Sequence, residues 1–218
     1  MTAIVRLAGV TKRYRRGREV VTAVDDVSLD LPPGSMIALV GPSGSGKTTL
    51  LNLICGGDEP DDGTIEGPLD TADWSQLAIV PQTIGLLPEL TMGENVGMPI
   101  RLGAPAATDV AEVMERLGIG ALADRPPEET SLGEQQRAAV ARALVTAPGL
   151  LIADEPTSHQ DEANTDRVGE ALADVVVSGS CVLVATHDSR LLARCDLVFH
   201  MRDGVVTGAN GVTRAGSG

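Results

Sequence analysis

A loop of eight residues could bind phosphate: Gly41, Pro42, Ser43, Gly44, Ser45, Gly46, Lys47 and Thr48 match the pattern G-x-x-x-x-G-K-[ST] at every fixed position. The apolar run 36–40 before it has the length of a strand, and residues 49–54 after it are typical of a buried helix. Glycines let the backbone wrap an anion, so that N–H groups and the positive end of the helix point at the phosphates. Lys47 would reach the β- and γ-phosphates, and the Thr48 hydroxyl would hold Mg²⁺. A chance Gly/Ser-rich turn is the alternative, but the order of strand, loop and helix favours a nucleoside triphosphate site.

Two carboxylates, Asp154 and Glu155, follow the apolar run 150–153. Such a run is typical of a buried strand, and open α/β sheets bind their ligands at the C-terminal ends of their strands. Because adjacent strand residues point in different directions, the two side chains have separate roles. Asp154 suits Mg²⁺, directly or through water, and Glu155 suits a general base that polarises the attacking water. The alternative is an acidic strand end that only caps a helix.

Two further polar residues follow apolar strands and are weak signals when each is taken alone. Gln82 comes after Pro81 and residues 78–80, and His187 comes after Thr186 and residues 182–185. A lone histidine at a strand end is usually a satisfied structural group, so contact with a γ-phosphate is only one of its two interpretations.

The composition limits the class of protein. A chain of 218 residues suits one domain, or one core with an inserted subdomain. The formal net charge of -13 argues against nucleic acid as a partner, because a phosphate backbone would be repelled by the molecule as a whole. One basic cluster near the start, which fits either a solvated hairpin or a role beside the nucleotide, comprises Lys12, Arg13, Arg15, Arg16 and Arg18.

The three cysteines show no C-x-x-C spacing, so we expect reduced, structural thiols in a cytosolic protein. The sequence contains neither a basic-plus-apolar N-terminal segment nor an apolar run of about 18 residues. We therefore expect no export signal and no direct membrane insertion, and any membrane contact would come through a partner.

The order of predicted elements is that of an α/β protein. Residues 1–207 are predicted to form a single domain, in which a helical subdomain at about 84–146 is inserted, and residues 208–218 are predicted to be a Gly-rich flexible tail. Thr91 and Glu94 form a capping box at a helix start, and Gly118 would end the helix 110–117. The other predicted helices are 134–146, 162–177 and a short one from residue 190, and the predicted strands are 4–7, 20–31, 36–40, 63–65, 77–80, 150–153, 181–185 and 197–201.

Five separated motifs together resemble the nucleotide-binding subunit of ATP-binding cassette (ABC) transporters, from about residue 5 to residue 206. In the family's order they are residues 41–48, 80–82, 131–137, 154–155 and 186–188. Residues 85–91 and 94–96 look like the subgroup that serves lipoprotein-release and macrolide-export systems, and the related cell-division ATPase. The resemblance implies a P-loop fold of ABC ATPase type, with a mostly parallel core sheet, an N-terminal antiparallel β layer and an inserted helical subdomain.

The resemblance also implies a role for each matching position. Tyr14 would stack on adenine, and residues 41–49, which end at Thr49, would bind the rest of ATP. Thr48, Gln82 and Asp154 would hold Mg²⁺, and Glu155, His187 and Gln82 would be catalytic, with His187 at the γ-phosphate. The signature residues Ser131, Gly133 and Glu134 would act on ATP in the opposite subunit, where a helix N-terminus meets the γ-phosphate. Ser158 and Asp161 match the loop that faces the other subunit.

The cofactors implied in this way are ATP and Mg²⁺. The implied partners are a second ABC ATPase domain, in a homodimer or a heterodimer, and a transmembrane permease subunit. Such a subunit would be cytoplasmic and peripheral on the inner face of the cell membrane. Neither the transported substrate nor a secure direction of transport is indicated, and export is implied by the subgroup alone.

The signature departs from the family at Leu132, where relatives usually carry the first of two glycines. A Cβ there stands where backbone would approach a phosphate, so we expect weak ATPase activity in a homodimer. Residues 67–76 are shorter than in relatives, which bears on coupling to a membrane partner. The open alternatives are a regulatory or scaffold subunit that binds ATP without hydrolysis, the degenerate half of a heterodimer and, more distantly, a P-loop kinase or GTPase.

Overall fold

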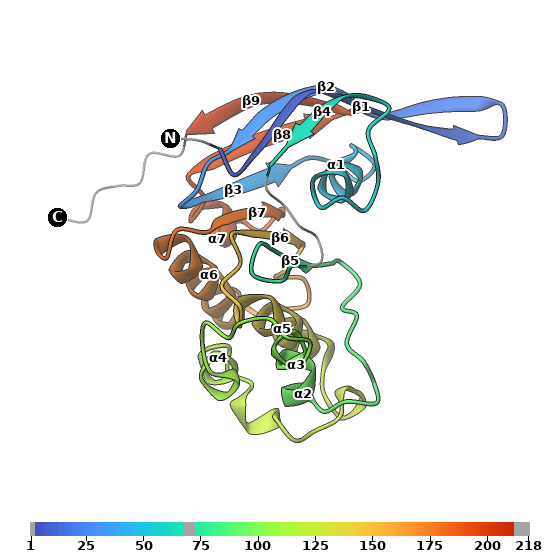
Figure 1. The fold of residues 1–218 in the computed structure, drawn as a ribbon. Coiled ribbons are helices and arrows are strands. Elements are labelled where there is room, and N and C mark those ends of the chain that lie inside the picture. Colours follow the sequence, from blue (N-terminus) through green and yellow to red (C-terminus); the bar gives the residue numbers. More distant parts are fainter. Residues whose placement is uncertain (1–2, 68–72, 212–218) are drawn as a thin grey trace.

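The computed structural model describes residues 3–67 and 73–211, and two β-sheets form its layers (Figure 1). The larger sheet has six strands in the order β5-β6-β7-β3-β8-β9, of which the first five are parallel and β9 is antiparallel to β8. Its central strands are buried at nearly every position, as expected for a parallel sheet covered on both faces. The strands are β3 (Ser35–Val40), β5 (Leu77–Val80), β6 (Leu150–Asp154), β7 (Cys181–Ala185), β8 (Leu197–Arg202) and β9 (Val205–Gly211).

The smaller sheet is antiparallel, in the order β2-β1-β4, with strands β1 (Val5–Arg16), β2 (Glu19–Leu31) and β4 (Asp62–Glu66). Val27, Leu29 and Leu31 of β2 are buried at alternate positions, and Val24 is buried on the other side of a register shift at which Asp26 has a φ of 49°. β1 is much longer than the predicted strand 4–7, because its polar second half pairs with β2 up to Arg16↔Glu19. The tip of this β1–β2 hairpin projects beyond the body of the molecule (Figure 1).

Helix α1 (Lys47–Ile54) lies between the two sheets. Its buried side chains Leu50, Leu51, Leu53 and Ile54 share one apolar cluster with inward residues of both sheets. The opposite face of the six-stranded sheet packs on α6 (Glu162–Val177) and α7 (Ser189–Leu192), together with the helical region 92–144. The start of α1, and with it the end of the phosphate loop, is thereby held between the two sheets.

The helical region lies between β5 and β6 in sequence and at the end of the molecule remote from the antiparallel sheet (Figure 1). The capping box at Thr91 is confirmed, with Glu94 N donating to Thr91 Oγ1 at 3.2 Å and Thr91 N donating to the Glu94 carboxylate at 3.0 Å. The region consists of α2 (Met92–Val96), α3 (Met98–Arg101), α4 (Val110–Arg116), α5 (Leu132–Leu144) and the 3-10 turns Gly120–Leu122 and Pro127–Glu129.

Helix α5 and the predicted tail also differ from their predicted boundaries. Helix α5 begins at Leu132 instead of Glu134, because Ser131 caps it, and it ends at Leu144, before Ala147 takes a φ of 43°. The flexible tail predicted from residue 208 is wrong for residues 208–211, which belong to β9 and pair along the open edge of β8. The remainder of that tail, 212–218, lies outside the described residues.

Within the described part of the chain, no helix is both long and apolar enough to cross a bilayer.

Candidate functional site

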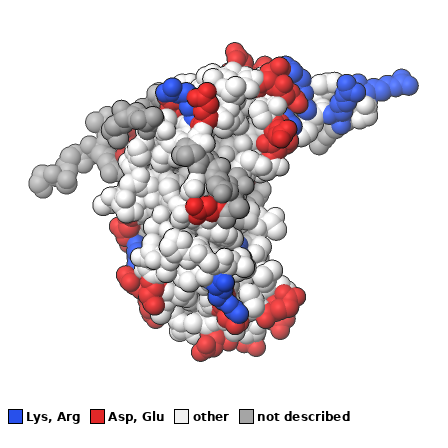
Figure 2. All heavy atoms as spheres, viewed as in Figure 1, with Lys and Arg blue, Asp and Glu red and all other residues white. Residues whose placement is uncertain are grey.

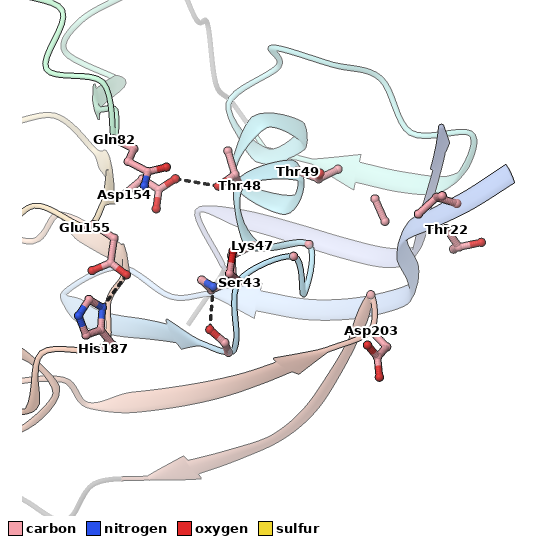
Figure 3. Close-up of a pocket in the computed structure, with 16 residues that line it drawn as sticks. Thr22, Ser43, Lys47, Thr48, Thr49, Gln82, Asp154, Glu155, His187 and Asp203 are labelled. Atoms are coloured by element: carbon pink, nitrogen blue, oxygen red, sulfur yellow. Dashed lines mark hydrogen bonds and ion pairs between the residues drawn. The ribbon is translucent and has the colours of Figure 1, made fainter. Parts of the chain in front are cut away.

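A cavity of about 650 Å³ gathers most of the predicted site residues (Figure 3). Its wall combines β2, the phosphate loop, the start of α1, the ends of β6 and β7, and the turn between β8 and β9. Pro42 and Ser45 of the loop do not line it. Lining residues that the sequence indicated are Gly41, Ser43, Gly44, Gly46, Lys47, Thr48, Thr49, Gln82, Asp154, Glu155 and His187.

The phosphate loop takes a conformation that needs glycine. Gly46 has a φ of 104°, and a Cβ on it would lie 2.0 Å from the Ala23 carbonyl oxygen of β2. Lys47 Nζ donates to the carbonyls of Gly41 at 2.8 Å and Pro42 at 3.1 Å, so the lysine arches back over the loop. The ammonium group thus lies against the backbone of the loop, where a phosphate oxygen bound in the loop could accept a hydrogen bond from it.

Thr48 and Asp154 bring two oxygens together at the floor of the cavity. Thr48 Oγ1 donates to Asp154 Oδ2 at 2.9 Å. Burial raises the pKa of Asp154, while the bond from Thr48 and the charge of Lys47 act in the opposite direction. Gln82 lies beside them (Figure 3). Hydroxyl, carboxylate and amide oxygens are ligands that suit Mg²⁺, so the donor set fits this ion.

Glu155 and His187 follow the ends of the neighbouring parallel strands β6 and β7, and His187 Nδ1 lies 2.9 Å from Glu155 Oε1. Glu155 has a φ of 50°, and its N–H donates to the Ala185 carbonyl at 2.8 Å. A non-glycine residue in this region needs support from its surroundings, which this bond supplies. The hydrogen bond to the Glu155 carboxylate is the main cause that raises the pKa of His187.

The signature residues lie at the start of α5 and do not line this cavity. Ser131 Oγ accepts from Glu134 N at 3.3 Å, and the Glu134 carboxylate accepts from Ser131 N at 2.7 Å and from Ser131 Oγ at 2.8 Å. These bonds to Ser131 lower the pKa of Glu134. Leu132 is 55% exposed, whereas Gly133 is buried. The first turn of α5, which Ser131 caps, therefore lies outside the cavity of the chain's own phosphate loop and leaves the Leu132 side chain exposed.

Tyr14 does not line the cavity. It pairs across the β1–β2 hairpin with Val21, which does line it. Its hydroxyl donates to Asp58 Oδ2 at 2.7 Å, and Lys12 Nζ lies 5.5 Å from its ring centroid. These partners bring the pKa of Asp58 to about 2. Stacking of Tyr14 on adenine stays a prediction.

The basic cluster is partly neutralised within the described chain. Lys12 pairs with Asp58 at 2.6 Å and Arg13 pairs with Asp62 at 2.8 Å. Figure 2 shows Lys and Arg along the projecting hairpin, while separate patches of acidic and basic residues lie on the rest of that face. The cluster thus fits a hairpin anchored at its base to residues 58–62.

Ser158 and Asp161 lie on the loop that leads from Glu155 to α6. Ser158 N donates to the Glu155 carbonyl at 3.1 Å, and Asp161 caps α6 by accepting from Asn164 N at 2.8 Å. The loop is therefore hydrogen-bonded to Glu155 at one end and forms the N-cap of α6 at the other.

Sequence reasoning missed several residues of the site. Val21, Thr22 and Ala23 line the cavity from β2, and Asp203 and Gly204 close it from the β8–β9 side. No local pattern signals a wall contributed by a distant strand. Gln160, which bonds to the start of α5, also went unnoticed because only its neighbours matched a motif.

A second, smaller hollow of about 210 Å³ opens on the other side of Gln82. It is lined partly by Ile79, an apolar residue that is 40% exposed, and by Cys55, whose thiol is free. Gln82 and Asp154 line both hollows, so one wall separates the phosphate site from this groove.

Comparison with known proteins agrees with this geometry. Residues 24–158 match the model of the family described as ABC transporter. The lipoprotein-releasing system ATP-binding protein LolD 1 of Rhodospirillum rubrum is 38% identical over 95% of this chain and 99% of its own length. The LolD protein of Pseudomonas fluorescens is 36% identical over 93% of this chain and 96% of its own length.

Solved structures are also similar. The ATP-binding cassette MJ0796, in a dimeric post-hydrolysis state bound to ADP and Pi, superposes with a TM-score of 0.86 at 30% identity, over 95% of this chain and 98% of that one. A second dimeric structure of MJ0796 gives a TM-score of 0.84 at the same identity. The chain therefore belongs to the ABC transporter family, as an ATPase that forms the ATP-binding subunit of a transporter.

Proposed function

We propose that the chain drives a separate transmembrane permease by closing and reopening a dimer of ABC ATPase domains around ATP, in an export-type system. The observation that carries the proposal is the convergence of Lys47, the Thr48–Asp154 pair and the Glu155–His187 pair on one cavity. Phosphate binding, metal binding and base catalysis each have a separate group there.

The site's own residues have distinct roles in hydrolysis. The loop N–H groups and Lys47 bind and orient the phosphates, in exchange for the carbonyls that Lys47 now contacts. Thr48, Asp154 and Gln82 would hold Mg²⁺, which neutralises charge on the phosphate oxygens when it is bound. Glu155 accepts the proton of the attacking water, and His187 holds the Glu155 carboxylate through Oε1.

Closure by a second subunit is supported by where the signature lies. The cavity is lined by no residue of 131–134, yet that run ends in a helix N-terminus suited to phosphate. A second subunit could bring its own Ser131–Glu134 turn over the open side. The dimeric relatives MJ0796, of similar fold, support this arrangement.

The permease is proposed to dock at the smaller hollow beside Gln82. Gln82 and Asp154 line this hollow, so a movement of the docked permease would be transmitted directly to both side chains. The relatives named for lipoprotein release support an export-type system and a position on the inner face of the cell membrane. The stretch 67–76, which the sequence linked to coupling with a membrane partner, lies partly outside the described residues, because it includes 68–72.

One alternative function has an observation in its favour. Leu132 places an exposed apolar side chain, instead of bare backbone, at the turn proposed to meet phosphate. A subunit that binds ATP and shapes a complex without turnover would tolerate such a change. A degenerate half of a heterodimer would tolerate it too.

A comparison of ATP turnover in the wild type, Glu155→Gln and Glu112→Gln tests the proposal. Glu112 lies on α4 outside the cavity, so its variant should match the wild type. Loss of the base should lower turnover by about 100-fold or more, with ATP binding retained. A wild type without turnover above background would favour the binding-only subunit, whereas equal, measurable turnover in all three proteins would show that Glu155 is not the base.

A further inference from the structure

Gln160 joins two segments that the motifs treat separately: the loop after Glu155 and the start of α5. Its Nε2 donates to the Gly133 carbonyl at 2.8 Å. Its Oε1 accepts from Arg137 Nη1 at 2.5 Å. A carbonyl on one side and a guanidinium on the other determine which amide atom faces which, because only one orientation satisfies both.

The two contacts lie four residues apart on α5, which is one helical turn. Gly133 and Arg137 therefore present neighbouring groups on the same face. A single amide that is hydrogen-bonded to both the Gly133 carbonyl and the Arg137 guanidinium restrains the rotation and the translation of the helix relative to the loop. Arg137 is buried, and burial lowers its pKa, while the charges of Glu134 and Asp161 counter the effect.

The helix and the loop also touch through backbone. A Cβ on Gly133 would lie 2.8 Å from the His159 carbonyl oxygen, so glycine is needed for this close approach. His159 has a φ of 63° and Glu155 a φ of 50°, so two residues in the left-handed region bracket the loop. Backbone of this kind keeps its shape only while its contacts hold it.

We propose that Gln160 is a positioning residue that couples the start of α5 to the loop carrying Glu155. The inference rests on the dimer proposed above, in which α5 acts on ATP of the other subunit while Glu155 acts on ATP of its own. Closure of the signature turn over one nucleotide would then position the carboxylate that accepts a proton from the water attacking the other nucleotide. Gln160 touches neither nucleotide in this account and acts through Gly133 and Arg137.

The test uses Gln160→Ala, which removes both contacts, and Gln160→Glu, which keeps an acceptor for Arg137 but offers no donor to the Gly133 carbonyl. Gln160→Glu also keeps the buried guanidinium paired should the alanine variant fold poorly. Gln76→Ala is the matched control, since Gln76 is a partly buried glutamine outside the cavity whose Nε2 donates to Asp73 at 3.0 Å.

We expect kcat to fall about tenfold in both Gln160 variants with KM within about twofold of wild type, because the base is misplaced while the phosphate loop is intact. In a Glu155→Gln background both variants should still form the Mg·ATP dimer, as judged by light scattering. Unchanged kcat would overturn the proposal. Loss of the dimer and of melting temperature together with kcat would also overturn it, because the amide would then only hold the fold of α5. If Glu155→Gln with Gln160 intact stays monomeric in Mg·ATP, the proposed dimer itself fails, and that outcome is visible before any Gln160 variant is compared.

Discussion

Glu155 and His187 face each other from the ends of two adjacent parallel strands, with His187 Nδ1 2.9 Å from Glu155 Oε1. The Glu155 side chain is 19% exposed and that of His187 is 88% exposed. The imidazole thus lies on the solvent side of a mostly buried carboxylate. In this position it can hold the carboxylate in place, and its own pKa responds to the carboxylate's charge.

The pKa of His187 is expected to lie above its ordinary value of 6.5, because Glu155 bonds to it and is charged. The resulting stabilisation is present in full below pH 6.5 and is lost as the pH rises through the higher pKa of the folded protein. Its size is small, because the imidazole is exposed. An NMR titration of His187 in the wild type and in Glu155→Gln measures the effect directly. Substitution by glutamine should move the pKa back toward 6.5, and an identical pKa in the two proteins would show that the pair does not form in solution.

Thr48→Val keeps the shape of the side chain and removes the hydroxyl that Asp154 accepts from. We expect the Mg²⁺ concentration for half-maximal ATPase activity to rise about tenfold or more, since one metal ligand is lost and the other loses its orientation. A magnesium titration of turnover at constant ATP checks this. A titration curve that superimposes on the wild type would mean that Thr48 does not hold the metal.

Leu132→Gly should raise ATP turnover, because removal of the Cβ lets the start of α5 approach a phosphate in the other subunit. We expect about a fivefold gain, offset in stability by roughly 1 kcal/mol from the helix propensity of glycine. Leu132→Ala is the matched control: it keeps the Cβ and so should stay near the wild-type rate. Equal steady-state rates for the glycine and wild-type proteins would show that Leu132 does not hold the site open.

Much of the site could be predicted because its groups are local in sequence. Gly41 to Thr48 form one turn, and Asp154 follows its own strand, so pattern alone indicated their chemistry. The partners of Tyr14 and Gln160 could not be predicted, since Asp58 and Gly133 reach them only through tertiary packing. The length of β1 was missed for a related reason, because its polar half is stabilised by pairing with β2 and not by apolar alternation.

The central claim is that two copies of this chain close around ATP. Light-scattering mass of purified Glu155→Gln, with and without Mg·ATP, tests it most directly, because the substitution blocks hydrolysis and traps the closed state. The account predicts a shift from monomer to dimer that needs both ATP and Mg²⁺. Persistent monomer in protein that demonstrably binds ATP would contradict closure by a second copy.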